Sequence, residues 1–86
     1  MPNKKEKKII DLLIATKSKK QAEDFLDIFL TESEVEEIKN RLKIYQMLLQ
    51  GVSQRQIAKD LGVGVATVIR GASELRNKKV VVKRMV

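Results

Sequence analysis

Residues 53–76 hold the side chains whose types and spacing best fit a chemical task. Their sequence, SQRQIAKDLGVGVATVIRGASELR, predicts a short helix, a glycine turn and a second helix. In a helix-turn-helix that binds DNA, the first helix crosses the backbone and the second enters the major groove. Basic groups on the first helix suit phosphates, and small residues opening the second allow close approach to base edges. The residues predicted to contact DNA are Gln54, Arg55, Lys59, Gly64, Val65, Ala66, Thr67 and Arg70.

A helical hairpin that only packs a core is the alternative interpretation of this segment. The distribution of charge helps to separate the two. Residues 1–20 carry a net charge of +5, residues 21–38 carry −7, and residues 39–86 carry +9. Within the segment itself, Asp60 and Glu74 are the only acidic residues. A basic C-terminal half is typical of a surface that binds polyanions, so we favour DNA binding.

The composition excludes several other classes of protein. The 86 residues contain no Cys and no His, which rules out disulfides, thiolate chemistry and the usual zinc sites. No phosphate loop or other catalytic motif is present, so we expect neither an enzyme nor a metal site. No apolar run approaches the length of about 18 residues that spans a membrane, and no signal-peptide cleavage site follows the basic start. We therefore expect a cytoplasmic protein without a membrane partner.

The elements that must position these residues are all predicted to be helices. Apolar residues at helical spacing indicate a first helix over residues 4–16. Ser18 with Gln21, and Thr31 with Glu34, match the capping box, in which two side chains cap the start of a helix. They predict the starts of the second and third helices. The acidic residues at the start of the third helix fit the positive end of its dipole better than a metal site.

Glycines and a third capping pair divide the second half of the chain. Gly51 ends the third helix, Ser53 begins a short fourth one, and the last helix runs from about Val65 to Arg76. The pattern of the tail KKVVVKRMV does not decide its structure. The alternatives are a helix, a strand, a disordered segment and a segment paired with a second chain. The predicted fold class is all-α, with about five helices in a single domain over residues 1–86.

The predicted third helix carries apolar residues on more than one face. Ile44 and Leu48 form a second face beside the main stripe, which includes Ile38, Leu42 and Tyr45. A helix that is apolar on two sides is buried on two sides. A chain this short buries only a modest core, so oligomerisation adds stability. The pattern therefore predicts either a central helix or a dimer interface.

The stretch LTESEVEEIKNRLKIYQMLLQG, followed by SQRQIAKDLGVGVATVIRG, resembles the core of the Trp repressor family. The resemblance covers about residues 28–76, and S-Q-R, G-V-G-V-A-T and I-R-G together are its most specific part. It implies an intertwined homodimer whose two reading heads bind a palindromic operator in double-stranded DNA. The family's DNA-contacting positions fall on Gln54, Arg55, Val65, Ala66 and Thr67. A further contact, basic in the family, falls on Ala58, beside Lys59.

The resemblance also implies a ligand, because the family binds L-tryptophan as a co-repressor between the reading heads and the dimer core. The two arginines that stack on the ligand fall on Arg41 and Arg70, and Gly71 matches a glycine that leaves room for it. Leu30 and Thr31 match the part of the site that the partner chain supplies. These five residues are the predicted ligand-binding set.

Glu74 departs from the family, which has a serine that contacts the head group of the amino acid. A glutamate there accepts hydrogen bonds from an ammonium group and repels a carboxylate. Glu74 also stands four residues before Lys78, the spacing of a helical ion pair. Two further departures concern the dimer. One residue fewer separates Gly51 from Ser53, and the tail KKVVVKRMV replaces the family's final helix.

The sequence thus predicts a sequence-specific DNA-binding regulator of transcription that acts as a repressor responsive to tryptophan or a related small molecule. Two alternatives stay open. A constitutive DNA-binding module without a co-effector is motivated by Glu74. A helical protein-interaction adaptor is motivated by the acidic segment between two basic ones.

Overall fold

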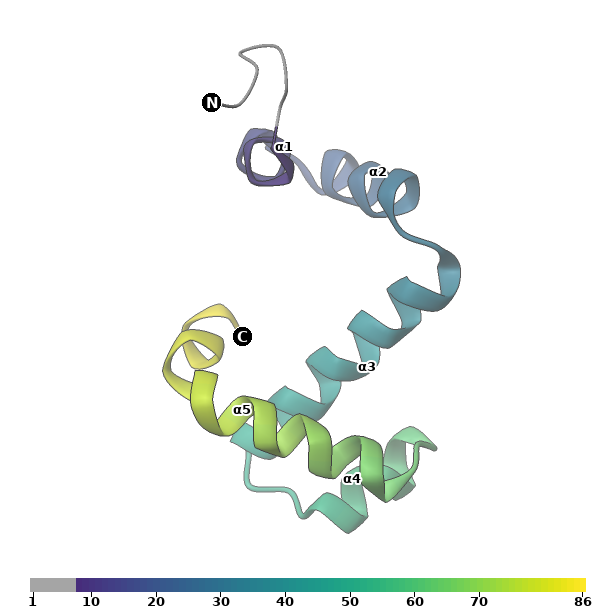
Figure 1. Ribbon diagram of the computed structural model, residues 1–86, viewed down its shortest axis with the longest axis vertical. Coiled ribbons are helices and arrows are strands. Elements are labelled where there is room, and N and C mark those ends of the chain that lie inside the picture. Colours follow the sequence, from purple (N-terminus) through teal and green to yellow (C-terminus); the bar gives the residue numbers. More distant parts are fainter. Residues whose placement is uncertain (1–7) are drawn as a thin grey trace. The chain divides into compact units, whose positions relative to one another are not determined.

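Five α-helices make up residues 8–86, the part of the chain described by the structure, which is a computed structural model (Figure 1). They are α1 (Ile9–Ala15), α2 (Lys19–Phe29), α3 (Glu32–Leu49), α4 (Gln54–Leu61) and α5 (Val65–Met85). The described residues contain no strand, and the prediction of an all-α fold with about five helices is confirmed. The helices fall into two compact units that divide between Val35 and Glu36, and each is described by itself. None of the described helices is long and apolar enough to cross a membrane.

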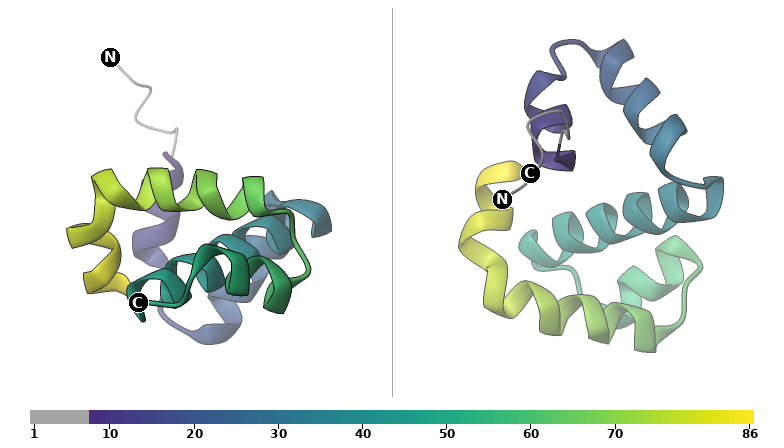
Figure 2. Two further views of the ribbon diagram at one scale, coloured as in Figure 1. Left: turned by 90° about the horizontal axis from the view of Figure 1, so that it is seen from below. Right: turned by 45° about the horizontal axis from the view of Figure 1, so that its top comes forward.

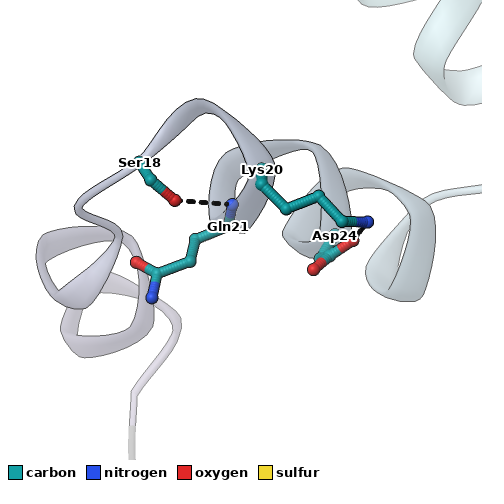
Figure 3. A network of polar contacts seen from close by, with 4 residues as sticks. All are labelled: Ser18, Lys20, Gln21 and Asp24. Carbon is teal, nitrogen blue, oxygen red and sulfur yellow. Dashed lines mark hydrogen bonds and ion pairs between the residues drawn. The ribbon is translucent and has the colours of Figure 1, made fainter.

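The start of α2 shows how local side chains set the helix boundaries. The Ser18 hydroxyl accepts a hydrogen bond from the Gln21 backbone N–H at 3.1 Å (Figure 3). The Gln21 side chain accepts from the Lys17 backbone N–H at 2.8 Å. The predicted start of this helix is therefore confirmed. In the first turn of α2, the Lys20 ammonium lies 2.7 Å from the carboxylate of Asp24, which is one turn further on, and the pair is exposed.

The apolar faces of α1 and α2 stay exposed in the single chain. Residues 4–7 of the predicted first helix lie outside the described residues, and α1 begins at Ile9. Neither helix contains a buried residue. Leu13 is 48% exposed, Ile14 74% and Phe29 53%. Among residues 8–35, the chain therefore has apolar faces without a buried core of its own.

Thr31 and Glu34 form the predicted capping box at the start of α3. The Glu34 backbone N–H donates to the Thr31 hydroxyl at 3.1 Å, and the Thr31 backbone N–H donates to the Glu34 carboxylate at 2.9 Å. Hydrogen bonding from the backbone and then the side chain of Thr31 lowers the pKa of Glu34 below its ordinary value. Part of the acidic cluster is thus explained by helix capping.

The core of the second unit lies where α3, α4 and α5 meet. Its buried cluster consists of Ile44, Ile57, Ala58 and Val68. The half-buried residues packed around the cluster are Tyr45, Met47, Leu48, Val52, Leu61 and Val63. Ile44 and Leu48 of the second face of the third helix therefore pack inside the chain, together with Tyr45 of the main stripe. On the main stripe, Ile38 remains 47% exposed and Leu42 43%.

The connection between α4 and α5 depends on Gly62. This residue ends α4 with φ +67°, and its N–H donates to the carbonyl of Ala58. The left-handed conformation is the usual role of glycine at the end of a helix. The last helix continues past Arg76, where the sequence predicted its end, to Met85. The tail is therefore helical, because it contains no Gly or Pro and its valines lower helix propensity without stopping the helix.

Replacing Gly62 with alanine should lower the free energy of unfolding by about 1 kcal/mol, because a Cβ disfavours the left-handed conformation. Packing adds nothing to this effect, since a Cβ at Gly62 meets no atom within 4 Å. Gly62→Asn is the control, because asparagine tolerates this conformation and should retain most of the stability. Urea denaturation compares the three proteins. Equal stability of the alanine variant and the unchanged chain would contradict the role given to the turn.

Candidate nucleic-acid interface

The helix pair α4 and α5 is held together by buried apolar residues. Ile57 and Ala58 of α4 are buried, as is Val68 of α5, and the two helices lie side by side in the views of Figures 1 and 2. The Ser53 hydroxyl caps α4 by accepting from the Gln56 backbone N–H at 3.2 Å. A capped short helix therefore packs on a longer one, and its assignment as a helix-turn-helix stays a prediction.

Every residue predicted to contact DNA lies exposed on this helix pair. The exposed set consists of Gln54, Arg55 and Lys59 on α4, Gly64 at the turn, and Val65, Ala66, Thr67 and Arg70 on α5. Within residues 8–86, neither Arg55 nor Lys59 forms an ion pair. Their charged groups are therefore available to an anionic partner such as phosphate. Their contact with DNA stays a prediction.

The N-terminus of α5 is not capped by a side chain of its N-cap residue. Gly64 is the N-cap residue and supplies no side-chain hydrogen bond. Its carbonyl accepts from the N–H groups of Thr67 at 3.1 Å and Val68 at 3.4 Å. The amides of Val65 and Ala66 lie in the first turn at the positive end of the helix dipole, an arrangement that favours phosphate. Val65, in this turn, is 47% exposed.

Ala58 cannot take the basic contact that the resemblance places there. It is only 6% exposed and belongs to the buried cluster, where α4 meets the rest of the unit. The neighbouring Lys59 is exposed on α4. Since consecutive residues of a helix point about 100° apart, Lys59 presents its ammonium in a direction different from that of Ala58.

A cavity of about 310 Å³ lies between α3 and α5 in the second unit. Its lining residues are Glu37, Asn40, Arg41 and Ile44 of α3, with Thr67, Arg70, Gly71 and Glu74 of α5. The predicted ligand residues Arg41, Arg70 and Gly71 are thus brought together. Leu30 and Thr31 are not among the lining residues, and the resemblance assigns those two positions to a partner chain. The volume suits a small molecule.

Sequence reasoning missed Glu37 and Asn40, which also line the cavity. A signal for both was present. Glu37, Asn40, Arg41 and Ile44 recur at spacings of three and four, and residues at that spacing share one face of a helix. Once Arg41 is assigned to a site, its helical neighbours on the same face become candidates.

Gly71 permits the close approach of α5 to α3. A Cβ at this position would lie 2.9 Å from Cγ2 of Ile44 and 3.9 Å from Cε1 of Tyr45. Ile44 is almost fully buried, so its side chain has little space to retreat. The resemblance explained this glycine by room for a ligand. The structure adds a packing reason, because the space that a side chain would fill is occupied by Ile44.

Glu74 hydrogen-bonds to Tyr45 across the two helices. The Tyr45 hydroxyl donates to Glu74 Oε2 at 3.0 Å. Burial, then the hydrogen bond to Glu74 and the charge of Glu74, raise the pKa of Tyr45 above its ordinary value. No ion pair between Glu74 and Lys78 is formed within residues 8–86, although their spacing allows one. The carboxylate is held at the wall of the cavity instead.

The chain is similar to known proteins over most of its length. A family model described as Trp repressor protein matches residues 4–85. A Trp operon repressor homolog of Vibrio campbellii (strain ATCC BAA-1116) is 41% identical over 71 residues, which cover 81% of this chain and 71% of that protein. A homolog of Vibrio vulnificus (strain YJ016) is 42% identical over 71 residues, covering 81% and 70%. One of Aliivibrio fischeri (strain MJ11) is 49% identical over 53 residues, covering 60% and 49%. No solved structure gives a significant match.

The all-α fold, the exposed basic helix pair and these similarities define the class of the protein, which is a DNA-binding transcriptional repressor. The chain belongs to the Trp repressor family. Its function is therefore regulatory.

Proposed function

We propose that the chain is a homodimeric repressor that binds a palindromic operator in a sequence-specific manner. The observation that carries this proposal is the exposed surface of α4 and the start of α5, where Arg55 and Lys59 form no ion pair within residues 8–86. Arg55 and Lys59 bind phosphates, and the uncapped first turn of α5 approaches the bases through Val65, Ala66 and Thr67. A repressor of this kind acts where the bacterial chromosome lies, in the cytoplasm, and catalyses no reaction.

The exposed apolar residues of a single chain support the homodimer. None of the residues of α1 and α2 is buried, and Ile38 and Leu42 of α3 are 47% and 43% exposed. Isolated soluble chains rarely leave so many large apolar side chains in contact with water. A second copy of this chain covers these faces symmetrically, as the intertwined dimer of the family does. Two reading heads then require two half-sites related by a twofold axis.

The cavity supports a response to a small molecule, tryptophan or a relative of it. Thr67 and Arg70 belong both to the predicted DNA contacts and to the cavity lining. A ligand in the cavity therefore touches the helix that reads the bases. It promotes repression only if it binds the DNA-competent arrangement of α5 more tightly than the alternatives. The constitutive module remains the rival, because Glu74 alters the lining.

Selection of bound duplexes from a random DNA pool tests the proposal. The full chain is used at about 50 mM salt, with and without L-tryptophan. We expect a palindromic sequence with two half-sites to be enriched, and more strongly with the amino acid present. Equal enrichment in both conditions would favour the constitutive module. Failure to retain any duplex would contradict DNA binding and leave the protein-interaction adaptor.

A further inference from the structure

Four charged side chains line the cavity between α3 and α5, and their charges cancel. Glu37 and Arg41 come from α3, and Arg70 and Glu74 come from α5. Within residues 8–86, no ion pair joins any two of them. A bound molecule therefore meets both carboxylates and guanidinium groups, none of which is held in an ion pair within residues 8–86.

Glu74 is the carboxylate whose position is fixed. It is half-buried, and its Oε2 accepts the hydrogen bond of 3.0 Å from Tyr45. Tyr45 is itself held, because it packs against the buried cluster around Ile44. No described residue donates a hydrogen bond to the other oxygen, Oε1. Glu37, in contrast, is exposed and has no such support. An acceptor that is already ordered loses less entropy when it binds a ligand.

We propose that Glu74 makes this cavity selective for small aromatic amines, whose ammonium group donates to the open oxygen of its carboxylate. The inference rests on the proposed function, since it assigns a ligand class to the same cavity. The planar guanidinium groups of Arg41 and Arg70 stack on the aromatic ring. A carboxylate on the ligand is dispensable, because its repulsion by Glu74 offsets its attraction to the guanidinium groups. Tyr45 is a positioning residue that aims the carboxylate and does not touch the ligand.

Titration calorimetry on the full chain with three indoles tests this selectivity. Tryptamine carries only the amine, indole-3-propionate carries only the carboxylate, and L-tryptophan carries both. We expect tryptamine to bind about ten-fold more tightly than indole-3-propionate, because an ionic hydrogen bond is gained. It should bind at least as tightly as L-tryptophan, because it lacks the carboxylate that Glu74 repels.

Variants then assign the effect to Glu74. Glu74→Gln keeps the shape of the side chain and should weaken tryptamine about ten-fold while strengthening indole-3-propionate. Glu36→Gln removes the same charge from an exposed residue of α3 outside the cavity and should leave both affinities unchanged. Tyr45→Phe should reduce the ratio of the two affinities, a readout that general loosening of the fold would not move.

Several results would overturn the inference. Binding of indole-3-propionate as tight as that of tryptamine would do so, as would an unchanged preference in Glu74→Gln. The absence of binding by all three indoles at millimolar concentration would also refute it. Affinity for the selected duplex is measured on the same samples without ligand. Duplex binding with the wrong ligand preference refutes only the inference, whereas the expected preference without duplex binding refutes only the proposed function.

Discussion

Replacing Arg55 with alanine is expected to lower the affinity of the proposed dimer for its operator by about 100-fold. Arg55 is exposed in the first turn of α4 and has no ion pair within residues 8–86. Its guanidinium group is therefore available to a phosphate without breaking a contact in the protein. Each of the two copies loses one charge-assisted contact, worth about ten-fold. Fluorescence anisotropy with the selected duplex measures the change.

The salt dependence shows whether the lost contacts are phosphate contacts. The slope of log affinity against log salt should become shallower by about 2, because two fewer counterions are released for each dimer. Lys43→Ala is the matched control, since it removes the same charge from an exposed position on α3. It should change the affinity much less. If Arg55→Ala altered neither affinity nor slope while the helical content was kept, α4 would not face the duplex.

The helix starts were predictable from the sequence because capping is a local interaction. Ser18, Thr31 and Ser53 each bond to the backbone N–H three residues later, as their sequence spacing indicated. The end of α5 was not predictable in the same way. Three successive valines are compatible with a helix and with a strand, so the sequence does not decide between the two. The structure of the chain does, because α5 extends to Met85.

Periodicity predicted two apolar faces on the third helix without indicating which partner covers each. The structure packs Ile44 into the core and leaves Ile38 and Leu42 partly exposed. A hydrophobic stripe does not indicate which surface will pack against it. The free energy gained when apolar side chains leave water is about the same for any apolar partner, because the hydrophobic effect is non-directional. The same limit applies to α1, whose apolar spacing was recognised and which contains no buried residue.

The resemblance located the cavity better than residue types alone did. Arg41, Arg70 and Gly71 line it together, although they come from two helices far apart in the sequence. The bond between Tyr45 and Glu74 joins residues 29 positions apart, so no local pattern indicates it. Local spacing suggested Lys78 as the partner of Glu74 instead. Long-range pairs of this kind could not be predicted from this sequence alone. Here the pair of Tyr45 and Glu74 supports the proposed ligand preference.

Replacing Ile57 with alanine should destabilise the protein by about 3 kcal/mol, because it leaves a cavity at a fully enclosed position. Ile57 is 0% exposed and joins α4 to the cluster formed with Ile44 and Val68. For a domain of this size, such a loss lowers the melting temperature by about 15 °C. Thermal unfolding followed by circular dichroism measures the shift. The protein concentration is held constant, because the stability of a dimer depends on it.

A graded control separates loss of volume from other effects of the substitution. Ile57→Val removes one methylene group and should cost about 1 kcal/mol. Below its melting temperature, the alanine variant should also bind the operator more weakly, because Ile57 holds α4 against α5 and thereby sets the position of Arg55. An unchanged melting temperature of the Ile57→Ala variant would show that the side chain of Ile57 does not stabilise the core. Normal stability combined with lost duplex binding would instead place Ile57 in the interface with DNA.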